Sequence, residues 1–161
     1  MKYSVAVIIP TYNRARTLRR ALESVFEQTR QPEEVCVIDD GSTDSTEVLV
    51  KEHFSQVIYI RQRNLGVSAA RNAGVEATSS DCVAFLDSDD EWLPKKLEVQ
   101  LSELEASPDI RLVHSDEIWI RNGKRVNQMH KHKKSGGYIF PLCLPLCAIS
   151  PSAAVLHRSL L

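Results

Sequence analysis

Short apolar runs alternate with amphipathic segments along the first two thirds of the chain. Residues 5–9 form a continuous apolar run that ends at Pro10. This is typical of a strand covered on both faces in a parallel sheet. After a polar turn, helical spacing continues through about residue 29, with apolar residues at Leu18, Leu22, Val25 and Phe26. The pattern therefore predicts a strand followed by a helix that packs on the sheet.

The same strand-then-helix unit recurs along the chain. Strands are predicted at residues 35–38, 57–60 and 82–86, each followed by a helical segment. Asp44 and Glu47 form a capping-box pair ahead of the second helix. The third helix, residues 66–77, is rich in Ala and Gly, which permits close approach to its neighbours. The fourth begins near Pro94, with an apolar stripe at Leu93, Leu97, Leu101 and Leu104.

Beyond residue 110 the pattern changes from strand-helix units to a hairpin. A strand is predicted at 110–113, and residues 118–120 lead into Asn122-Gly123, a strong two-residue turn signal. Residues 138–156 are apolar enough to suggest a bilayer span, but Pro141, Pro145 and Pro151 would interrupt a helix. We therefore expect a buried loop or a broken helix there. The opening residues are read as the first strand and not as a signal peptide.

Repeated strand-helix units predict the fold class and the place of the site. Right-handed crossovers build a Rossmann-like, doubly wound sheet with α/β/α layers, and ligands bind at the carboxyl ends of its strands. Function is therefore expected after residues 10, 38 and 86. The 161 residues, 43% of them hydrophobic, are enough for one core, so residues 1–161 are treated as a single domain.

Composition excludes some functions. Lys and Arg total 20 against 21 Asp and Glu, and the formal net charge of -1 disfavours a nucleic-acid partner. Cys36 and Cys82 fall in predicted core strands, where a thiol acts as a small apolar group. Nothing indicates an oxidising compartment, so a cytoplasmic location is expected. A zinc site is disfavoured because its candidate ligands have unsuitable spacing: His130, His132, Cys143 and Cys147.

Polar and acidic groups follow three of the predicted strands, at residues 11–13, 39–40 and 87–90. Carboxylates gathered at adjacent strand ends repel one another unless a cation or hydrogen-bond donors lie among them. In residues 87–89, alternation along an extended chain places Asp87 and Asp89 on the same side, which suits Mg²⁺ or Mn²⁺. A single DxD motif is nevertheless weak, because acidic residues at a strand end also cap turns and helices.

Four motifs in order identify a resemblance that covers nearly the whole chain and weakens from about Arg121. They are VAVIIPTYNR, VCVIDDGSTDST, NLGVSAARNAG and FLDSDDEWLP. The chain resembles the inverting family 2 glycosyltransferases with the GT-A fold. The resemblance implies metal-assisted sugar transfer from a nucleoside-diphosphate sugar, with a UDP-sugar expected. The acceptor would be a glycan, a lipid-linked molecule or a protein.

The resemblance also implies roles for residues of the nucleotide site. Pro10, Thr11 and Tyr12 match the segment that lies against the nucleotide base. Asp40 matches the carboxylate that recognises uracil, and Asp39 either orients that loop or touches the nucleoside.

A second group matches the diphosphate side of the site. Arg71 matches a basic residue of the nucleotide site, where its guanidinium would also offset the acidic rim. Asp89 matches a direct ligand of Mn²⁺ or Mg²⁺. Asp87, the other DxD residue, is expected nearer the ribose and is a second candidate ligand.

The catalytic base is not assigned within this sequence. The resemblance places it in an acidic motif beyond Leu161, whereas Asp116 and Glu117 precede the hairpin and are expected in the strand after the metal motif. Transfer also needs a general base near the acceptor hydroxyl. Two alternatives stay open: a module that binds a nucleotide sugar without transferring it, and an aspartate-dependent phosphatase. The phosphatase pattern is disfavoured because Glu91 stands where it has Thr or Val.

Two further expectations concern partners. Six basic residues occur between positions 121 and 134 without an acidic one: Arg121, Lys124, Arg125, Lys131, Lys133 and Lys134. They form either a solvated loop or a surface that attracts a lipid phosphate or an anionic glycan, with peripheral association at the inner face of a membrane. An uncovered apolar run at 139–156 would favour a homodimer or aggregates.

Overall fold

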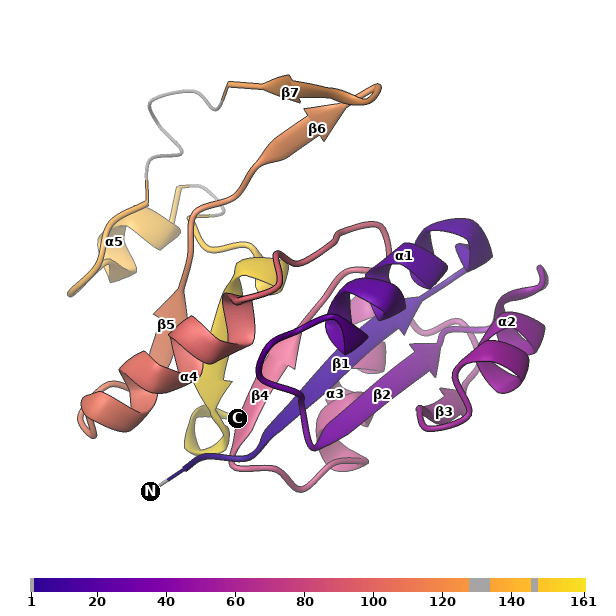
Figure 1. The fold of residues 1–161 in the computed structure, drawn as a ribbon, viewed down its shortest axis with the longest axis horizontal. Helices are drawn as coiled ribbons and strands as arrows, with labels where there is room; N and C mark the ends of the chain where they lie inside the picture. The colour runs from indigo at the N-terminus through magenta and orange to yellow at the C-terminus, as the bar shows by residue number, and fades with distance from the viewer. Residues whose placement is uncertain (1, 128–133, 146–147) are drawn as a thin grey trace.

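The computed structural model describes residues 2–127, 134–145 and 148–161. Its main sheet has the order β3-β2-β1-β4-β8-β5, shown in Figure 1. Four neighbouring strands are parallel: β1 (Val5–Thr11), β2 (Glu34–Asp39), β3 (Ile58–Arg61) and β4 (Cys82–Phe85). β8 (Ala154–His157) runs antiparallel to both β4 and β5 (Leu112–His114).

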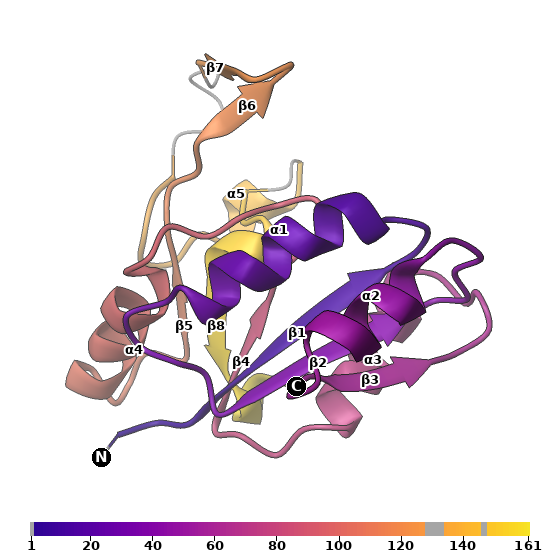
Figure 2. The same ribbon diagram turned by 45° about the vertical axis from the view of Figure 1, so that its right-hand side comes forward.

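Helices cover both faces of this sheet (Figure 2). α1 (Ala15–Phe26), α2 (Thr46–His53) and α4 (Lys96–Ala106) pack on one face, and α3 (Val67–Glu76) packs on the other. Alternation along β1 produces the two layers of core, because Val5, Val7 and Ile9 join the first and Ile8 lies on the opposite side. The predicted α/β/α fold with a mostly parallel sheet is confirmed.

The third helix approaches the sheet as closely as its small residues predicted. A Cβ added at Gly74 in α3 would lie 2.3 Å from Cγ2 of Ile8 in β1. Ile8 is fully buried and cannot turn away into solvent. The packing of α3 on β1 therefore requires glycine, which has no Cβ, at position 74.

We expect Gly74→Ala to lower the melting temperature. Overpacking a close-packed core costs about 1 to 3 kcal/mol, which is larger than the roughly 1 kcal/mol by which alanine favours a helix over glycine. Gly136→Ala is the matched control, because a Cβ there meets no atom within 4 Å. Thermal unfolding of the two variants provides the measurement. A Gly74→Ala protein as stable as the unmodified chain would show that β1 shifts without cost.

The prediction of a buried loop or a broken helix at residues 138–156 is wrong for the last part, which holds a strand. The described residues of the first part include a short helix, α5 (Phe140–Cys143), and the exposed apolar side chains in and beside it are Tyr138, Phe140, Leu142 and Leu144. The last part is not a loop, because β8 inserts between β4 and β5 and its Val155 is fully buried. Pro151 starts a 3₁₀ turn that precedes the strand, so the proline does not interrupt it. Among the described residues of 138–156, the large exposed apolar side chains therefore lie in the first part.

The predicted hairpin is confirmed as β6 (Trp119–Arg121) and β7 (Lys124–Val126). Asn122 and Gly123 both have positive φ, at 51° and 72°, as a type I′ turn requires. The hairpin projects away from the main sheet in Figures 1 and 2. Its basic residues are exposed: Arg121, Lys124 and Arg125.

Other expectations about the later chain are only partly described. Lys131 and Lys133 lie outside the described residues, as do three of the four candidate zinc ligands: His130, His132 and Cys147. Cys143 is exposed, whereas Cys36 and Cys82 are buried free thiols whose pKa burial raises to about 11. Within the described ranges, no helix has the length and apolar content needed to cross a bilayer.

Candidate functional site

The carboxyl ends of β1, β2 and β4 meet at one edge of the sheet. β1 lies between the other two, because the chain passes from β1 to β2 and β3 on one side and then crosses to β4 on the other. Ligands of doubly wound sheets bind at such a switch point. Three loops form this rim, at residues 11–14, 39–45 and 86–92, and they carry the groups that the sequence placed there.

Asn13 ties the first loop to the second. Its backbone N–H donates to Ser42 Oγ at 2.8 Å, and its side-chain oxygen accepts from the backbone N–H of Thr43 at 2.7 Å. Its φ of 53° is left-handed, which asparagine tolerates better than most residues. The loop that follows β1 is therefore held in one position.

Asp44 provides a second tie between the same loops. It accepts hydrogen bonds from the backbone N–H groups of Ala15 at 3.1 Å and Thr46 at 3.0 Å. The predicted capping box is wrong, because Glu47 pairs with Lys51 at 2.6 Å. The Asp44 carboxylate links the starts of α1 and α2, and this shared role replaces the expected box.

Asp39 is fully buried, and both of its oxygens are engaged. One accepts from the backbone N–H of Ser42 at 2.7 Å, and the other accepts from the hydroxyl of Tyr59. Burial and this contact with a carboxylate raise the pKa of Tyr59, so its phenol stays a donor. These contacts position the loop after β2.

Asp40 lies beside Asp39 and faces the loop that precedes α3. Its carboxylate accepts from Gln62 Nε2 at 2.7 Å, from the Leu65 N–H at 2.9 Å and from the Gly66 N–H at 2.8 Å. Burial alone would raise its pKa, but these three hydrogen bonds outweigh burial and lower it. An ionised carboxylate has about four acceptor positions, and these hydrogen bonds use three of them on a residue that is 5% exposed.

The end of β1 offers two further groups beside Asp40. The Thr11 carbonyl accepts from the Asp40 N–H at 2.8 Å, which fixes their spacing. The Thr11 hydroxyl is buried and has no hydrogen-bond partner among the described residues. The Tyr12 ring is 47% exposed and is available to a planar ligand, whereas Pro10 is buried within the strand.

Residues 87–90 form a turn and not the extended segment that the sequence suggested. The Asp90 N–H donates to the Asp87 carbonyl at 3.0 Å, which closes the turn. The argument that alternation places Asp87 and Asp89 on one side is therefore wrong. Asp87 accepts from Arg71 Nη2 at 2.6 Å, and Asp89 accepts from Arg14 Nη1 at 2.8 Å.

Several residues that secure this turn were missed from sequence. Ser152 Oγ accepts from the Asp87 N–H at 3.0 Å, and Trp92 Nε1 donates to the Ser152 carbonyl at 2.8 Å. Burial raises the pKa of Asp90, and the charges of Asp87 and Asp89 add to that rise. Ser152 lies more than sixty positions from the turn, so no local pattern could have identified it.

The turn fits a divalent ion only with help from a substrate. Among residues 2–127, 134–145 and 148–161, no three His, Cys, Asp or Glu side chains gather as a metal cluster. Mg²⁺ sites commonly take one or two carboxylates, several waters and the phosphates of a substrate. The half-exposed Asp89 carboxylate suits such a shared site. In this structure it pairs with another cation, the guanidinium of Arg14.

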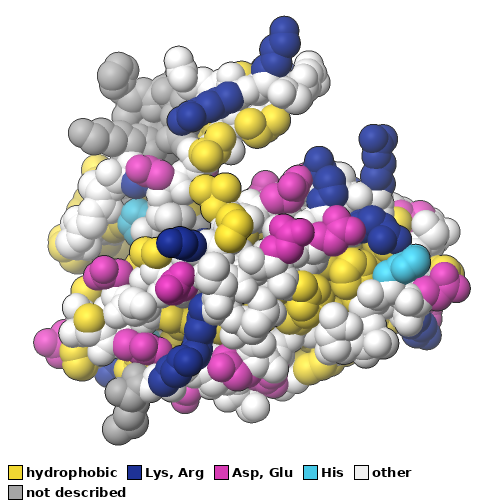
Figure 3. Space-filling model, viewed as in Figure 1, with side chains coloured by type: hydrophobic (Ala, Val, Ile, Leu, Met, Phe, Trp, Pro, Cys, Tyr) yellow, Lys and Arg dark blue, Asp and Glu magenta, His cyan; other side chains and the backbone are white. Residues whose placement is uncertain are grey.

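Figure 3 shows acidic and basic side chains next to one another on the face that it draws. At the rim, Arg71 and Arg14 pair with two carboxylates of the turn, those of Asp87 and Asp89. An anionic ligand such as a diphosphate would therefore meet arginines as well as carboxylates.

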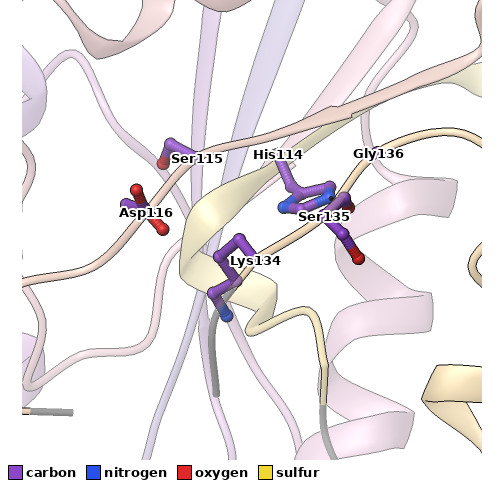
Figure 4. Close-up of a pocket in the computed structure, with 6 residues that line it drawn as sticks. All are labelled: His114, Ser115, Asp116, Lys134, Ser135 and Gly136. Atoms are coloured by element: carbon purple, nitrogen blue, oxygen red, sulfur yellow. Dashed lines mark hydrogen bonds between the residues drawn. The ribbon is translucent and has the colours of Figure 1, made fainter. Parts of the chain in front are cut away.

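A shallow, open pocket of about 280 Å³ lies between the end of β5 and residues 134–136, and Figure 4 shows its lining. Asp116 lines it, and Glu117 lies next to it in the chain. Both follow β5 and precede β6, so the prediction that they belong to a strand is wrong. Burial raises the Glu117 pKa, but hydrogen bonds from Trp119, Lys134 and Ser150 outweigh it and lower that pKa. Glu117 is therefore a weak proton acceptor.

The fold is shared with solved structures of glycosyltransferases. The structure superposes on Staphylococcus aureus TarS 1–349 in complex with UDP-GlcNAc with a TM-score of 0.75, at 22% identity over 98% of this chain and 46% of that one. It also resembles the mannosyltransferase PcManGT from Pyrobaculum calidifontis, in complex with GDP-Man and Mn²⁺, with a TM-score of 0.70 and 21% identity over 99% and 46%. These likenesses show the shared fold.

The family follows from sequence. Residues 6–161 match the model of glycosyl transferase family 2, and the chain belongs to that family. It is 32% identical over 161 residues to the Escherichia coli UDP-Glc:alpha-D-GlcNAc-diphosphoundecaprenol beta-1,3-glucosyltransferase WfgD, covering 99% of this chain and 62% of WfgD. A glycosyltransferase of Rickettsia bellii is 36% identical over 148 residues, which are 91% of this chain and 21% of that protein. The chain thus spans only part of its relatives.

Proposed function

We propose that this chain forms the donor-binding part of a glycosyltransferase that uses a UDP-sugar and a divalent ion and inverts the anomeric carbon. One observation carries the proposal: Asp40, whose hydrogen bonds hold its pKa low, shares the switch-point edge with the acidic turn of Asp87 and Asp89. A carboxylate there suits a donor on a base, and an acidic turn suits a metal-bound diphosphate.

Each end of the nucleotide has a partner in this proposal. Asp40 accepts the N3–H of uracil, and the exposed ring of Tyr12 lies against the base. The orphan hydroxyl of Thr11 finds a polar partner on the nucleoside. Asp39 orients the loop through Ser42 and Tyr59 and does not touch the ligand.

The acidic turn and Arg71 act on the diphosphate. Arg71 holds Asp87 at 2.6 Å, and both side chains are at least two thirds buried. Asp87 is thereby oriented toward the ribose side, and Asp89 provides a carboxylate oxygen to Mn²⁺ or Mg²⁺. When bound, the ion would neutralise charge that develops on the departing diphosphate. The protein residues position that group and keep it in line with the acceptor.

Transfer to an acceptor is proposed for the whole protein, with an acidic residue outside residues 1–161 as general base. Glu117 does not suit this role, because its hydrogen bonds to Trp119 and Lys134 occupy its carboxylate and lower its pKa. WfgD is named for a lipid-linked diphosphate acceptor. A glycan, a lipid-linked molecule or a protein remains a candidate acceptor. The second function, donor binding without transfer, uses the same donor site.

A screen of nucleotides tests the proposal. UDP, UDP-glucose and UDP-GlcNAc should raise the melting temperature in the presence of Mn²⁺, whereas GDP, ADP and CDP should raise it less. Stabilisation reports binding directly, because a ligand that binds only the folded state shifts unfolding by mass action. Equal shifts with all four nucleoside diphosphates would contradict recognition of uracil. Release of UDP from a UDP-sugar, compared between this chain and the whole protein, then separates turnover from binding.

A further inference from the structure

Two carboxylates of the acidic turn, those of Asp87 and Asp89, are each held by an arginine, but the two pairs differ in exposure. Arg71 and Asp87 have side-chain exposures of 22% and 33%, whereas Arg14 and Asp89 are 52% and 50% exposed. The Arg14–Asp89 pair is thus open to solvent and to small ligands. It also involves the carboxylate that we assign to the metal.

Arg14 reaches Asp89 from a fixed point on the backbone. Its carbonyl accepts from the N–H groups of Thr17 at 3.1 Å and Leu18 at 2.9 Å, so it caps the start of α1. Asn13, the residue before it, is tied to Ser42. Only the side chain of Arg14 needs to move for the pair to break, and these backbone contacts survive its replacement.

We propose that Arg14 competes with the divalent ion for Asp89 and thereby makes metal binding depend on the nucleotide. The inference rests on the proposed function, in which Asp89 holds the ion. A guanidinium 2.8 Å from Asp89 Oδ2 satisfies that oxygen and repels a second cation brought to the same carboxylate. Without nucleotide, the ion must displace Arg14 into water.

A bound diphosphate changes this competition. Its negative charge attracts both the ion and the displaced guanidinium, which pairs well with phosphate oxygens. The free energy lost when the Arg14–Asp89 ion pair breaks is then offset by a new ion pair between Arg14 and the diphosphate. The ion binds weakly before the donor and more tightly after it, so an empty site does not retain metal.

A second ion pair that involves α1 provides the control. It separates competition for Asp89 from the effect of losing one positive charge near the rim. Arg20 of α1 lies 3.2 Å from Glu91, with exposures of 56% and 51%, much like Arg14 and Asp89. Arg20→Gln removes one positive charge near the rim without freeing Asp89. Working at about 0.15 M salt shortens the Debye length to roughly 8 Å and weakens distant effects.

The experiment measures Mn²⁺ binding by the decrease of the free-ion signal in electron paramagnetic resonance, with and without UDP. The proteins are the unmodified chain, Arg14→Gln, Arg14→Lys, Arg20→Gln and Asp89→Asn. Without UDP, Arg14→Gln should bind Mn²⁺ about two- to fivefold more tightly, the range expected when a half-exposed ion pair no longer opposes the ion. Arg20→Gln should change the affinity less, and Arg14→Lys should lie between Arg14→Gln and the unmodified chain.

The factor by which UDP tightens Mn²⁺ binding should be smaller in Arg14→Gln than in the unmodified chain. Unchanged nucleotide-free affinity in Arg14→Gln, or an equal gain in Arg20→Gln, would overturn the competition by Arg14. If Asp89→Asn nevertheless loses nucleotide-dependent Mn²⁺ binding, the proposed metal site at Asp89 is still supported. If Asp89→Asn binds Mn²⁺ and UDP as the unmodified chain does, the proposed function itself fails and the inference falls with it.

Discussion

Asp40→Asn should weaken UDP binding about ten- to a hundredfold. A hydrogen bond to a charged group contributes about 1.5 to 3 kcal/mol, and each 1.4 kcal/mol is a factor of ten in affinity. In the proposal, Asp40 accepts the N3–H of uracil. An asparagine placed there presents either a neutral carbonyl or an N–H group, and the latter opposes the N3–H donor.

The same change should alter the choice of base. Cytosine has an acceptor at N3, which an ionised carboxylate repels and an asparagine N–H group can bind. The preference for UDP over CDP, measured by isothermal titration calorimetry in Mn²⁺, should therefore collapse in Asp40→Asn. Because the hydrogen bonds of Asp40 lower its pKa, the unmodified chain should keep its preference from pH 8 down to pH 5.

Asp44→Asn is the control for damage to the loop. Asp44 is another carboxylate of the same loop, with a lowered pKa and two backbone donors, but it links α1 to α2 and has no proposed contact with the base. It should reduce stability while leaving the UDP-to-CDP ratio close to that of the unmodified chain. An unchanged ratio in Asp40→Asn, in a variant that unfolds cooperatively, would show that Asp40 only caps the loop before α3.

Much of the fold could be predicted because its signals are local. Apolar runs located β1, β2 and β4, and the small residues of α3 indicated its close approach to Ile8. The strand β8 was missed because its pairing with distant strands, and not its local sequence, makes it a strand. Residues 154–157 become a strand by pairing with β4 and β5, which lie forty or more positions before it.

The candidate site could be predicted as far as it follows strand ends. The positions of Asp40, Asp87 and Asp89 at one edge follow from parallel strands, and the motif order supplied their expected roles. The orientation of the side chains depends on distant partners such as Arg14 and Ser152. For this reason the turn at residues 87–90 was mistaken for an extended segment, although its acidic residues were assigned to the site.

UDP and Mn²⁺ together should raise the melting temperature by more than the sum of their separate shifts. The described residues do not supply a metal cluster of their own, so the ion needs the oxygens of the diphosphate, and the diphosphate needs the ion to lie beside Asp87 and Asp89. Binding energy of this kind appears as added stability of the folded state. Two independent sites would instead give additive shifts.

Asp89→Asn should remove the joint part of that shift and leave a small effect of UDP alone. Replacing the carboxylate by an amide removes the charge with little change in shape, so the turn closed by Asp87 and Asp90 should persist. Glu91→Gln is the matched control, because Glu91 is an exposed carboxylate two residues away that pairs with Arg20 and has no assigned metal. It should keep the excess shift. If Asp89→Asn keeps it too, the ion lies elsewhere. If both variants lose it, the ion responds to the total charge of the rim and not to a bond with Asp89.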